Sequence, residues 1–518
     1  MKNFDFWGHK WALSLTAAIL LGVSYPPFNL AILQIPAFIC LFRIAVLCET
    51  KRQVIYYTYP SLVLWNLITT YWLMMATVAG GIAAILANAV LMLIPLLLIR
   101  SLFRSSINPV FASIMAASIW VSYEFLHHNW DLAWPWLTLG NGWSNLTGAI
   151  QYISVTGVFG ISFWIVLSSA SFFLYLQNPV RKNLYAAIIL FSIFPALSVV
   201  TAVTSTTHAD GKPVNVAIVQ PNSDSYQRFG GLSSLDELLD KLLVMSDTVR
   251  TEETDVIIWP ENALDASLSY SNMYFDRIQD SLRVWDTQLI TGTGYAEYFY
   301  DEDTKPQVVR YNHAGVPFNV FNAAFHFQPD QPAGIYRKGK LVPVVERFPF
   351  VEFFQSIDRL ELVNWGQQMG YGLGLEATTF NVNGAETTAL ICYDSVFPGW
   401  VNKFVENGAT FLTIVTNDGW WGNSSGHIQH FAYARLRAIE HRMWVTRSAN
   451  NGISGIISPD GKVQVQTEYW TEDAFRFTIN SNNNPTFYAR YGNWIAYISL
   501  IVSIFGLGIV YIKNRNRD

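Results

Sequence analysis

Charge is scarce in this 518-residue sequence, because only 14% of its residues are Asp, Glu, Lys or Arg, against about 25% in a typical soluble domain. The shortage is concentrated in residues 1–204, which contain nine basic and four acidic side chains. Residues 205–490 contain 21 basic and 33 acidic side chains. This distribution excludes a purely soluble protein and a disordered chain. The acidic balance of the middle region also argues against a nucleic-acid binder.

Cysteine is almost absent as well, with three residues in the whole chain. A disulfide-stabilised scaffold is therefore excluded. Cys40 and Cys48 lie in or at the end of an apolar run, where they are expected to fill space. Cys392 is the only thiol of residues 205–490, so it has no disulfide partner there. By itself it is either an inert core residue or a nucleophile.

The sequence contains several long hydrophobic runs, most of them in the region that is poor in charge. A helix that crosses a bilayer needs about 20 mainly apolar residues. Eight runs approach this length, at about 11–23, 30–48, 54–78, 82–99, 108–126, 152–177, 183–203 and 492–512. We predict a membrane domain with seven transmembrane helices at 1–204, a soluble α/β domain at 205–490, and an eighth transmembrane helix with a basic tail at 491–518.

Basic residues occupy every second connection between these runs. They are Lys51, Arg52, Arg100, Arg104, Arg181, Lys182, Lys513, Arg515 and Arg517. Because cytoplasmic loops collect Lys and Arg, both termini are expected in the cytoplasm and residues 205–490 outside. The alternative for the first run is a cleaved signal sequence, but Pro26-Pro27 follows it instead of a small-residue cleavage site.

Some residues in and between the runs are polar or amphipathic. Arg43 and Glu124 lie within or near the ends of runs, and snorkelling to the bilayer surface is expected for both. The connection 127–151 contains Trp130, Trp134, Trp136 and Trp143. Tryptophan favours the headgroup level of a bilayer, so this loop is either an interfacial belt or one wall of a lipid entrance.

Short apolar segments alternate with amphipathic ones in the middle region, which predicts an α/β domain. Strands are expected at 214–219, 255–259, 288–291, 320–327, 333–336, 387–392, 410–416, 444–447 and 452–458. Helices are expected near 232–251, 396–407 and 428–442. Three polar residues, Glu261, Lys338 and Cys392, stand at or just after strand ends. Together they supply what thiol acyl transfer needs: a base, a cation for the oxyanion, and a nucleophile.

These three residues resemble the Glu–Lys–Cys triad of the carbon–nitrogen hydrolase (nitrilase) superfamily. The motifs are Trp259-Pro260-Glu261, Tyr336-Arg337-Lys338-Gly339-Lys340-Leu341-Val342-Pro343 and Cys392-Tyr393. With the domain inserted between the seventh and eighth runs, nearly the whole chain resembles the apolipoprotein N-acyltransferase family. Other matching segments include Ser24-Tyr25-Pro26-Pro27-Phe28, Thr416-Asn417-Asp418-Gly419-Trp420-Trp421-Gly422 and His430. The resemblance implies a four-layer αββα sandwich on a base of eight membrane helices.

The resemblance also implies roles for single residues. Glu261 would be the general base, Lys338 the oxyanion stabiliser and Cys392 the nucleophile. Supporting roles would fall to Glu346, Tyr393 and Asp394.

Two departures from the family pattern affect these supporting residues. The family has Pro-Phe-Gly-Glu where this chain has Pro343-Val344-Val345-Glu346, which puts the backbone path into Glu346 in question. It has Cys-Tyr-Glu where this chain has Cys392-Tyr393-Asp394, which puts an acceptor-positioning role of Asp394 in question.

The implied activity is transfer of an acyl chain from a phospholipid, through a thioester on Cys392, to the α-amine of the diacylglyceryl-cysteine of an apolipoprotein. The phospholipid donor and the diacylated apolipoprotein are the expected partners, and the bacterial inner membrane is the expected location, with the catalytic domain in the periplasm. No cofactor and no metal are expected, since His427 and His430 lack a third ligand at a zinc spacing. The alternatives are a membrane-tethered amidase acting on a small substrate and a non-catalytic transporter or scaffold.

An aromatic segment follows the lysine motif. Six of the eight residues of 347–354, with the sequence RFPFVEFF, are apolar. The segment is either core or a mobile hydrophobic arm over the active site. We expect Phe350 and Phe353, with Trp420 and Trp421, to form a lipid-binding mouth.

Overall fold

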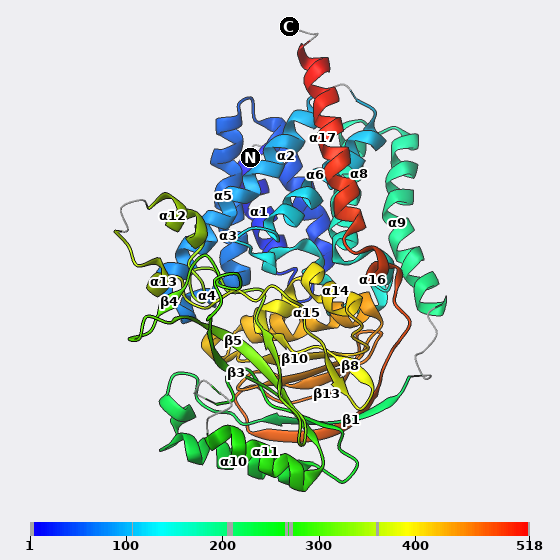
Figure 1. Cartoon of the computed structure of the whole chain (residues 1–518). Coiled ribbons are helices and arrows are strands. Elements are labelled where there is room, and N and C mark those ends of the chain that lie inside the picture. Colours follow the sequence, from blue (N-terminus) through cyan, green and yellow to red (C-terminus); the bar gives the residue numbers. More distant parts are fainter. Residues whose placement is uncertain are drawn as a thin grey trace.

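A computed structural model describes residues 5–105, 107–204, 211–264, 268, 273–358 and 362–515. A bundle of helices lies at one end of the molecule and an α/β domain at the other (Figure 1). The last long helix, Trp494–Arg515, returns to the bundle. The α/β domain is therefore connected to the bundle at both of its ends. The predicted combination of an apolar helical bundle and an α/β domain is confirmed, whereas Arg517 and the predicted boundary at 204/205 involve residues outside the described ranges.

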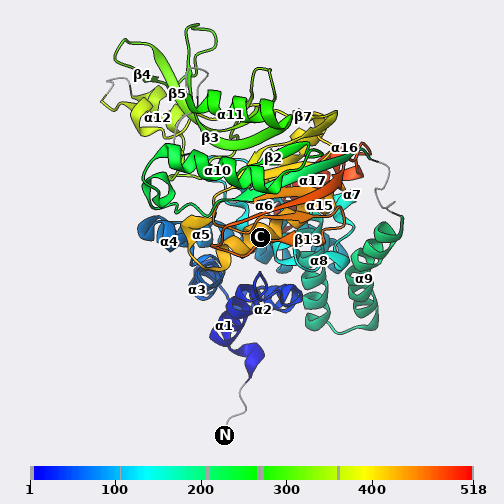
Figure 2. The ribbon, with the colours of Figure 1, turned by 90° about the horizontal axis from the view of Figure 1, so that it is seen from below.

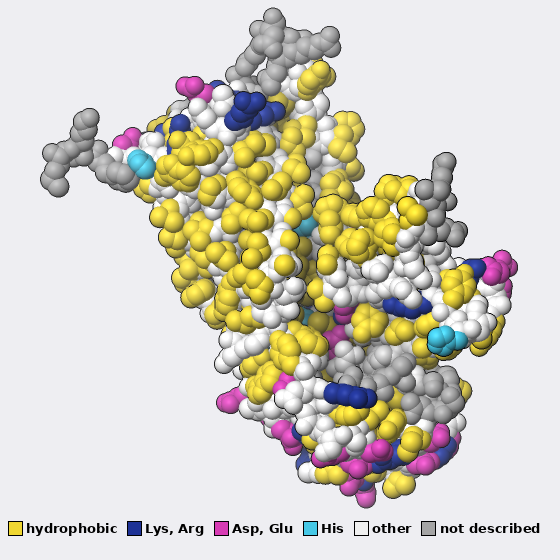
Figure 3. Space-filling view, turned by 90° about the vertical axis from the view of Figure 1, so that its left-hand side faces the viewer, with side chains coloured by type: hydrophobic (Ala, Val, Ile, Leu, Met, Phe, Trp, Pro, Cys, Tyr) yellow, Lys and Arg dark blue, Asp and Glu magenta, His cyan; other side chains and the backbone are white. Residues whose placement is uncertain are grey.

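The bundle is built from the apolar runs. Its long helices are α1 (Lys10–Gly22), α2 (Gln34–Leu47), α3 (Lys51–Thr70), α5 (Val78–Phe103), α6 (Pro109–His127), α8 (Val158–Gln177), α9 (Arg181–Thr204) and α17 (Trp494–Arg515). Among the described residues, five helices are long and apolar enough to cross a membrane: α5, α6, α8, α9 and α17. A broad band of hydrophobic side chains covers the bundle, and basic residues lie at its end away from the α/β domain (Figure 3). Eight membrane crossings stay a prediction.

Two of the predicted runs are interrupted by turns. Run 54–78 contains most of α3, the short α4 (Leu73–Ala76) and the first residue of α5. Run 152–177 is divided at Gly157 into α7 (Ile153–Thr156) and α8. Gly157 has φ of +65°, and a Cβ there would lie 2.4 Å from the Tyr488 ring. Hydropathy alone does not report such a turn, because the residues on both sides are apolar.

Glu124 does not snorkel. Glu124 is only 4% exposed. Its Oε1 accepts hydrogen bonds from Trp120 Nε1 and from the backbone N–H of Leu139, both at 2.9 Å. The expectation of snorkelling is wrong for this residue because the loop after α6 folds back and supplies the carboxylate with donors inside the protein.

The loop 127–151 is not a simple interfacial belt. It contains three 3-10 helices, η3 (Pro135–Leu137), η4 (Leu139–Trp143) and η5 (Thr147–Ala149). Trp136 and Trp143 are only 1% and 3% exposed, so the belt hypothesis is wrong for them. Trp130, at 38% exposed, is open to the surroundings. Most of this loop therefore packs between the bundle and the α/β domain.

Two sheets form the centre of the α/β domain. The first contains β1 (Pro213–Gln220), β2 (Val256–Ile258), β3 (Gln288–Tyr298), β4 (Arg310–Tyr311), β5 (Pro317–Phe327), β6 (Gly334–Arg337) and β14 (Asp473–Asn480). The second contains β9 (Leu390–Ile391), β10 (Leu412–Thr416), β11 (Val445–Ala449), β12 (Gly455–Ile457) and β13 (Val463–Gln466). The strand orders are β14-β1-β2-β3-β5-β4, with β6 beside β5, and β13-β12-β11-β10-β9; β7 (Phe380–Val382) and β8 (Ala385–Thr387) form a separate hairpin.

Helices cover the outer faces of both sheets. The first sheet is covered by α10 (Leu235–Val249) and α11 (Met273–Trp285), and the second by α14 (Pro398–Glu406) and α15 (Ser425–His441). Strands β1 and β2 of one sheet share a core with β10 and β11 of the other. The layers therefore follow the order helix, sheet, sheet, helix (Figures 1 and 2), as expected for an αββα sandwich. Shorter helices are η6 (Arg228–Gly231), α12 (Val351–Ile357), α13 (Trp365–Gln368) and α16 (Phe487–Tyr491).

Gln429 on α15 joins the α/β domain to the bundle. Its Oε1 accepts hydrogen bonds from the indole N–H groups of Trp72 and Trp136, at 3.2 and 2.7 Å. Its Nε2 donates to the backbone carbonyls of Pro26 and Thr69, at 2.9 and 3.0 Å. One buried, fully paired amide thus ties the outer helix layer to three segments of the bundle.

Candidate active site

The three predicted catalytic residues meet between the two sheets. Glu261 follows β2, Lys338 follows β6 and Cys392 follows β9. Lys338 Nζ lies 3.2 Å from Glu261 Oε1 and 2.8 Å from Glu346 Oε1. The residues are buried, with Glu261 4%, Lys338 1% and Cys392 9% exposed. The Lys338 ammonium is thus buried between the carboxylates of Glu261 and Glu346 and near the Cys392 thiol. These groups are not exposed charges at strand ends, and such buried clusters of ionisable groups are typical of functional sites.

Neighbouring strands hold Glu261 in place. Its Oε1 also accepts a hydrogen bond from Asn322 Nδ2 at 2.8 Å, and its Oε2 accepts one from the backbone N–H of Asn417 at 3.0 Å. Gly292 on β3 makes room for this segment, since a Cβ there would lie 2.6 Å from the Cα of Glu261. The carboxylate is thereby fixed by donors from three different elements.

Cys392 begins the 3-10 helix η7 (Cys392–Val396) and is not the last residue of a strand. The predicted strand 387–392 is divided into β8 and β9, and Cys392 itself has φ of +48°. A non-glycine residue in this left-handed region is strained. The turn takes the thiol out of the plane of the sheet and toward Glu261 and Lys338.

Burial and nearby charges control the protonation of the site. Burial raises the pKa of the Cys392 thiol well above its ordinary value, the Glu261 carboxylate raises it further and Lys338 opposes both. The pKa of Lys338 is well above its ordinary value although burial lowers it, because Glu261 and Glu346 stabilise the ammonium. At neutral pH the site therefore contains a neutral thiol beside a permanent cation, and the thiol needs a base.

The departure at residues 343–346 does not prevent Glu346 from reaching Lys338. Val344 takes φ of +69°, a strained conformation for a β-branched residue. The Glu346 carboxylate then accepts a hydrogen bond from the backbone N–H of Val342 at 2.7 Å as well as from Lys338. With this backbone path the Glu346 carboxylate still reaches the Lys338 ammonium.

Asp394 connects the cysteine segment to the lysine segment. Its carboxylate accepts hydrogen bonds from the Tyr336 hydroxyl at 2.8 Å, from Lys340 N–H at 2.7 Å and from Ile391 N–H at 3.1 Å. Burial raises the pKa of Asp394 to about 7. Through these contacts Asp394 holds the cysteine segment and the lysine segment together inside the protein.

Tyr393 points in another direction from Asp394. The Tyr393 hydroxyl donates to the carbonyl of Ala133, in the loop after α6, at 2.9 Å. The residue after Cys392 thus contacts the bundle side of the molecule, and the candidate site lies against the loop 127–151.

The four residues predicted to form a lipid mouth are not in one place. Phe353 and Trp420 are 59% and 40% exposed. Phe350 is half-buried, and its backbone N–H donates to Asp131 Oδ2 at 2.6 Å. Trp421 packs against Trp72 of the bundle with a ring separation of 4.7 Å. Trp421 is thus part of the contact between domains, whereas the aromatic segment 347–354 reaches the loop after α6.

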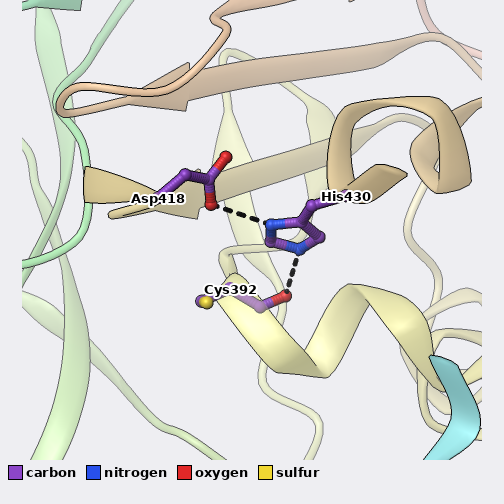
Figure 4. Close-up of side chains that lie close together, drawn as sticks. All are labelled: Cys392, Asp418 and His430. Atoms are coloured by element: carbon purple, nitrogen blue, oxygen red, sulfur yellow. Dashed lines mark hydrogen bonds and ion pairs between the residues drawn. The ribbon is translucent and has the colours of Figure 1, made fainter. Parts of the chain in front are cut away.

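Several polar residues at the site carry no sequence-based role. Asn322 donates to both active-site glutamates, at 2.8 and 3.1 Å. Figure 4 shows Asp418 and His430 beside Cys392. Arg447 pairs with Asp418, and the three residues form a buried group. Asp418 and His430 belong to the matched motifs, and a polar residue within the apolar strand β5 is a signal that could have identified Asn322.

The group of Asp418, His430 and Arg447 behind Cys392 includes possible metal ligands, but the charge of its carboxylate is already neutralised. Cys392, Asp418 and His430 each place one possible ligand atom within 4.8 Å of the others. The guanidinium of Arg447 already lies 2.7 Å from Asp418, and the imidazole pairs with the same carboxylate at 2.8 Å. A cation and a hydrogen bond therefore occupy the carboxylate that a metal would need.

Comparisons with known proteins cover both parts of the chain. Residues 215–483 match the family model for carbon–nitrogen hydrolases, and residues 17–171 match the model for the N-terminal domain of apolipoprotein N-acyltransferase. The chain is 30% identical over 509 residues to an apolipoprotein N-acyltransferase of Chlorobaculum tepidum, covering 94% of each chain. It is 27% identical over 435 residues to apolipoprotein N-acyltransferase 2 of Treponema denticola, covering 78% of this chain and 77% of that one. A carbon–nitrogen hydrolase superfamily protein of Xanthomonas campestris matches 52% of this chain and 91% of its own, with 17% identity and a TM-score of 0.37.

Proposed function

Because the chain belongs to the apolipoprotein N-acyltransferase family and carries a carbon–nitrogen hydrolase domain, we propose that it transfers an acyl chain from a phospholipid to the N-terminal α-amine of a diacylglyceryl-cysteine on apolipoproteins. The observation that carries this proposal is the buried contact of Lys338 with Glu261 and Glu346 beside Cys392. That arrangement suits thioester chemistry at a water-poor site next to an apolar bundle.

In the first step Cys392 attacks the ester carbonyl of the phospholipid. Glu261 takes the thiol proton, which the raised pKa of the thiol makes necessary. The Lys338 ammonium stabilises the oxyanion of the tetrahedral intermediate. Collapse breaks the ester bond, the lysophospholipid oxygen takes the proton from Glu261, and the acyl group stays on Cys392 as a thioester.

In the second step the α-amine of the acceptor attacks the thioester carbonyl. Glu261 accepts a proton from the amine, Lys338 again stabilises the oxyanion, and the carbon–sulfur bond breaks. An amide forms, and the Cys392 thiolate takes up the proton that Glu261 accepted from the amine. Glu346 keeps Lys338 in place during both steps through their 2.8 Å contact, while Tyr393 and Asp394 support the cysteine and lysine segments.

Apolar helices and the family assignment make this a membrane protein. The alternation of basic connections supports a bacterial inner membrane location with both termini in the cytoplasm and the α/β domain in the periplasm. In that location both substrates reach the enzyme from the outer leaflet. The exposed Phe353 and the half-buried Phe350 of segment 347–354 would contact lipid at the entrance.

The test is the intact mass of the purified full-length enzyme after incubation with phospholipid vesicles. Wild type should gain one acyl group on Cys392, and Cys392→Ala should gain none. Lys338→Ala should form the adduct at least about 10²-fold more slowly, as is typical for loss of one oxyanion donor, and Glu261→Gln should be nearly inactive. Hydrolysis of a small amide without any acyl adduct would favour the membrane-tethered amidase instead.

A further inference from the structure

The hydroxyl of Tyr336, near the end of β6, is buried and has three hydrogen-bond partners. It accepts from the backbone N–H of Gly339 and from the indole N–H of Trp400 on α14, both at 3.1 Å. Asp394 Oδ2 lies 2.8 Å from the same hydroxyl oxygen. Because the two nitrogens can only donate, they occupy both lone pairs of the hydroxyl, and its one proton is donated to the carboxylate. All the hydrogen-bonding capacity of this hydroxyl is therefore used inside the protein.

These contacts fix the turn that follows Lys338. Gly339, whose N–H donates to the hydroxyl, is the next residue, and the N–H of Lys340 donates to Asp394 Oδ1 at 2.7 Å. A Cβ on Gly339 would lie 2.0 Å from the Trp400 ring, so the indole lies against this turn only because the residue is glycine. The two backbone N–H groups after the lysine are thus bound by one hydroxyl and by the carboxylate that this hydroxyl contacts.

Asp394 extends this connection to the thiol. Its Oδ2 also accepts from the N–H of Ile391, the residue before Cys392, at 3.1 Å. Cys392 itself has φ of +48°, a strained conformation that persists only where the surrounding contacts determine it. Burial and the Asp394 carboxylate raise the pKa of the Tyr336 hydroxyl well above its ordinary value, so the hydroxyl keeps the proton that it donates. The hydrogen bond from Tyr336 to Asp394 therefore joins the turn after the lysine to the turn that presents the thiol.

We propose that Tyr336 is a positioning residue, whose hydroxyl sets the geometry between the Lys338 ammonium and the Cys392 thiol. The ammonium has to meet the oxyanion on the carbon that the sulfur attacks, so the two side chains must be placed relative to each other and not only each within its own segment. A displacement of about 1 Å at a reacting group can lower a rate about 10²-fold. The inference rests on the proposed function, in which Lys338 stabilises the oxyanion formed when Cys392 is acylated.

The experiment compares two reactions of Cys392 in the full-length enzyme in detergent. Acylation by phospholipid passes through an oxyanion, whereas alkylation by iodoacetamide does not, and peptide mapping separates this thiol from Cys40 and Cys48. Tyr336→Phe removes the hydroxyl and keeps the ring, which packs edge-on against Phe404 at 5.2 Å. Acylation should slow about 10- to 100-fold, while alkylation stays within about threefold of wild type. The KM for phospholipid should not change, because the hydroxyl is bonded only to groups of the protein.

Tyr433→Phe is the matched control, because Tyr433 is also buried and its hydroxyl donates to the carbonyl of Trp136 at 3.2 Å. This control should keep the wild-type rates of both reactions. Wild-type acylation in Tyr336→Phe, or an equal loss of acylation and alkylation, would overturn the positioning role. If Tyr336→Phe does not fold, Asp394→Asn removes the charged acceptor of the same hydrogen bond and should slow acylation alone. An absence of acylation in the wild-type enzyme would reject the proposed function, whereas normal acylation in both tyrosine variants would reject only this inference.

Discussion

Asn322 shows how one side chain organises the reacting groups. Its Nδ2 donates to Glu261 at 2.8 Å and to Glu346 at 3.1 Å, while the backbone N–H of Lys338 donates to the backbone carbonyl of Asn322 at 2.9 Å. The amide thus contacts both carboxylates that flank the lysine, and it comes from β5, a strand that supplies no catalytic residue. Its loss would let both carboxylates move relative to the thiol.

We predict that Asn322→Ala lowers the rate of acyl-enzyme formation about 10- to 100-fold, because hydrogen bonds to charged groups contribute about 1.5–3 kcal/mol. The rate is measured by intact mass at short times after mixing with phospholipid. Asn319→Ala on the same strand is the control, since Asn319 donates to the carbonyl of Val308, away from the glutamates. Equal losses in the two variants would mean that β5 was simply destabilised.

Strand β5 also contains a buried histidine that makes stability depend on pH. His326 is 4% exposed, and burial lowers the pKa of its imidazole to about 4 from an ordinary 6.5. Below pH 6.5 the unfolded chain therefore binds a proton that the folded protein excludes. Stability from this source is complete above pH 6.5 and is lost as the pH falls toward about 4, by up to roughly 3 kcal/mol.

The variant His326→Gln should show a weaker decline of the thermal unfolding temperature between pH 6.5 and pH 4. Glutamine keeps a donor for Gln288 Oε1, which accepts from His326 at 2.8 Å, but does not titrate. The exposed His313→Gln is the control and should retain the wild-type slope. If the two variants behave alike, His326 is not the source of the acid sensitivity.

Segment 347–354 is partly a small core of its own and partly exposed. Phe348 and Phe354 pack on Trp365, with ring separations of 5.8 and 5.6 Å. Phe353 points outward, and Phe350 lies 6.3 Å from the ring of Trp130 in the loop after α6. Phe353 lies at the exposed margin of this cluster, with its ring 5.7 Å from that of Phe354, and Phe350 lies outside the cluster.

Replacing Phe350 and Phe353 with serine should slow lipid-dependent acylation of Cys392 at least about tenfold, because each phenylalanine contributes about 1.5–3 kcal/mol when it is buried against lipid. Alkylation of the same thiol by a small water-soluble reagent should be preserved or faster. Phe354→Ser, at a half-buried ring stacked on Trp365, should instead lower thermal stability. If the double variant impairs both reactions and the stability alike, the arm is ordinary core and not a gate.

We predict that the molecule has the one orientation in the membrane that agrees with its basic connections. Single cysteines at Arg52 and Arg181 should react with a membrane-impermeant thiol reagent only after the inner membrane is opened, whereas a cysteine at Tyr300 should react in intact spheroplasts. Tyr300 is 85% exposed on the α/β domain, so its access to the reagent is assured. Labelling of Tyr300→Cys only after the membrane is opened would place the α/β domain in the cytoplasm and contradict a periplasmic reaction.

Much of this architecture is readable from the sequence because its signals are local. Apart from the two runs that turns interrupt, the apolar runs predict the bundle helices within a few residues, and β1, β5 and β10 lie where β-branched apolar segments predict them. The motifs around Glu261, Lys338 and Cys392, through their resemblance to a known triad, predict three residues that the structure brings together between the two sheets. Gly157, by contrast, divides a run that is apolar throughout, and only its contact with Tyr488 reveals the turn.

What the sequence could not determine depends on contacts between distant segments. Glu124 has the sequence environment of a snorkelling residue, and it is buried only because Leu139 folds back to supply a donor. The hydrogen-bond partners of His430 are Asp418, twelve residues away, and the carbonyl of Cys392 at the start of η7. Composition and periodicity fix which segments are apolar and which chemical groups are available. Burial, hydrogen-bond partners and net local charge arise only when the segments pack, because each is a property of neighbours that the chain order does not specify.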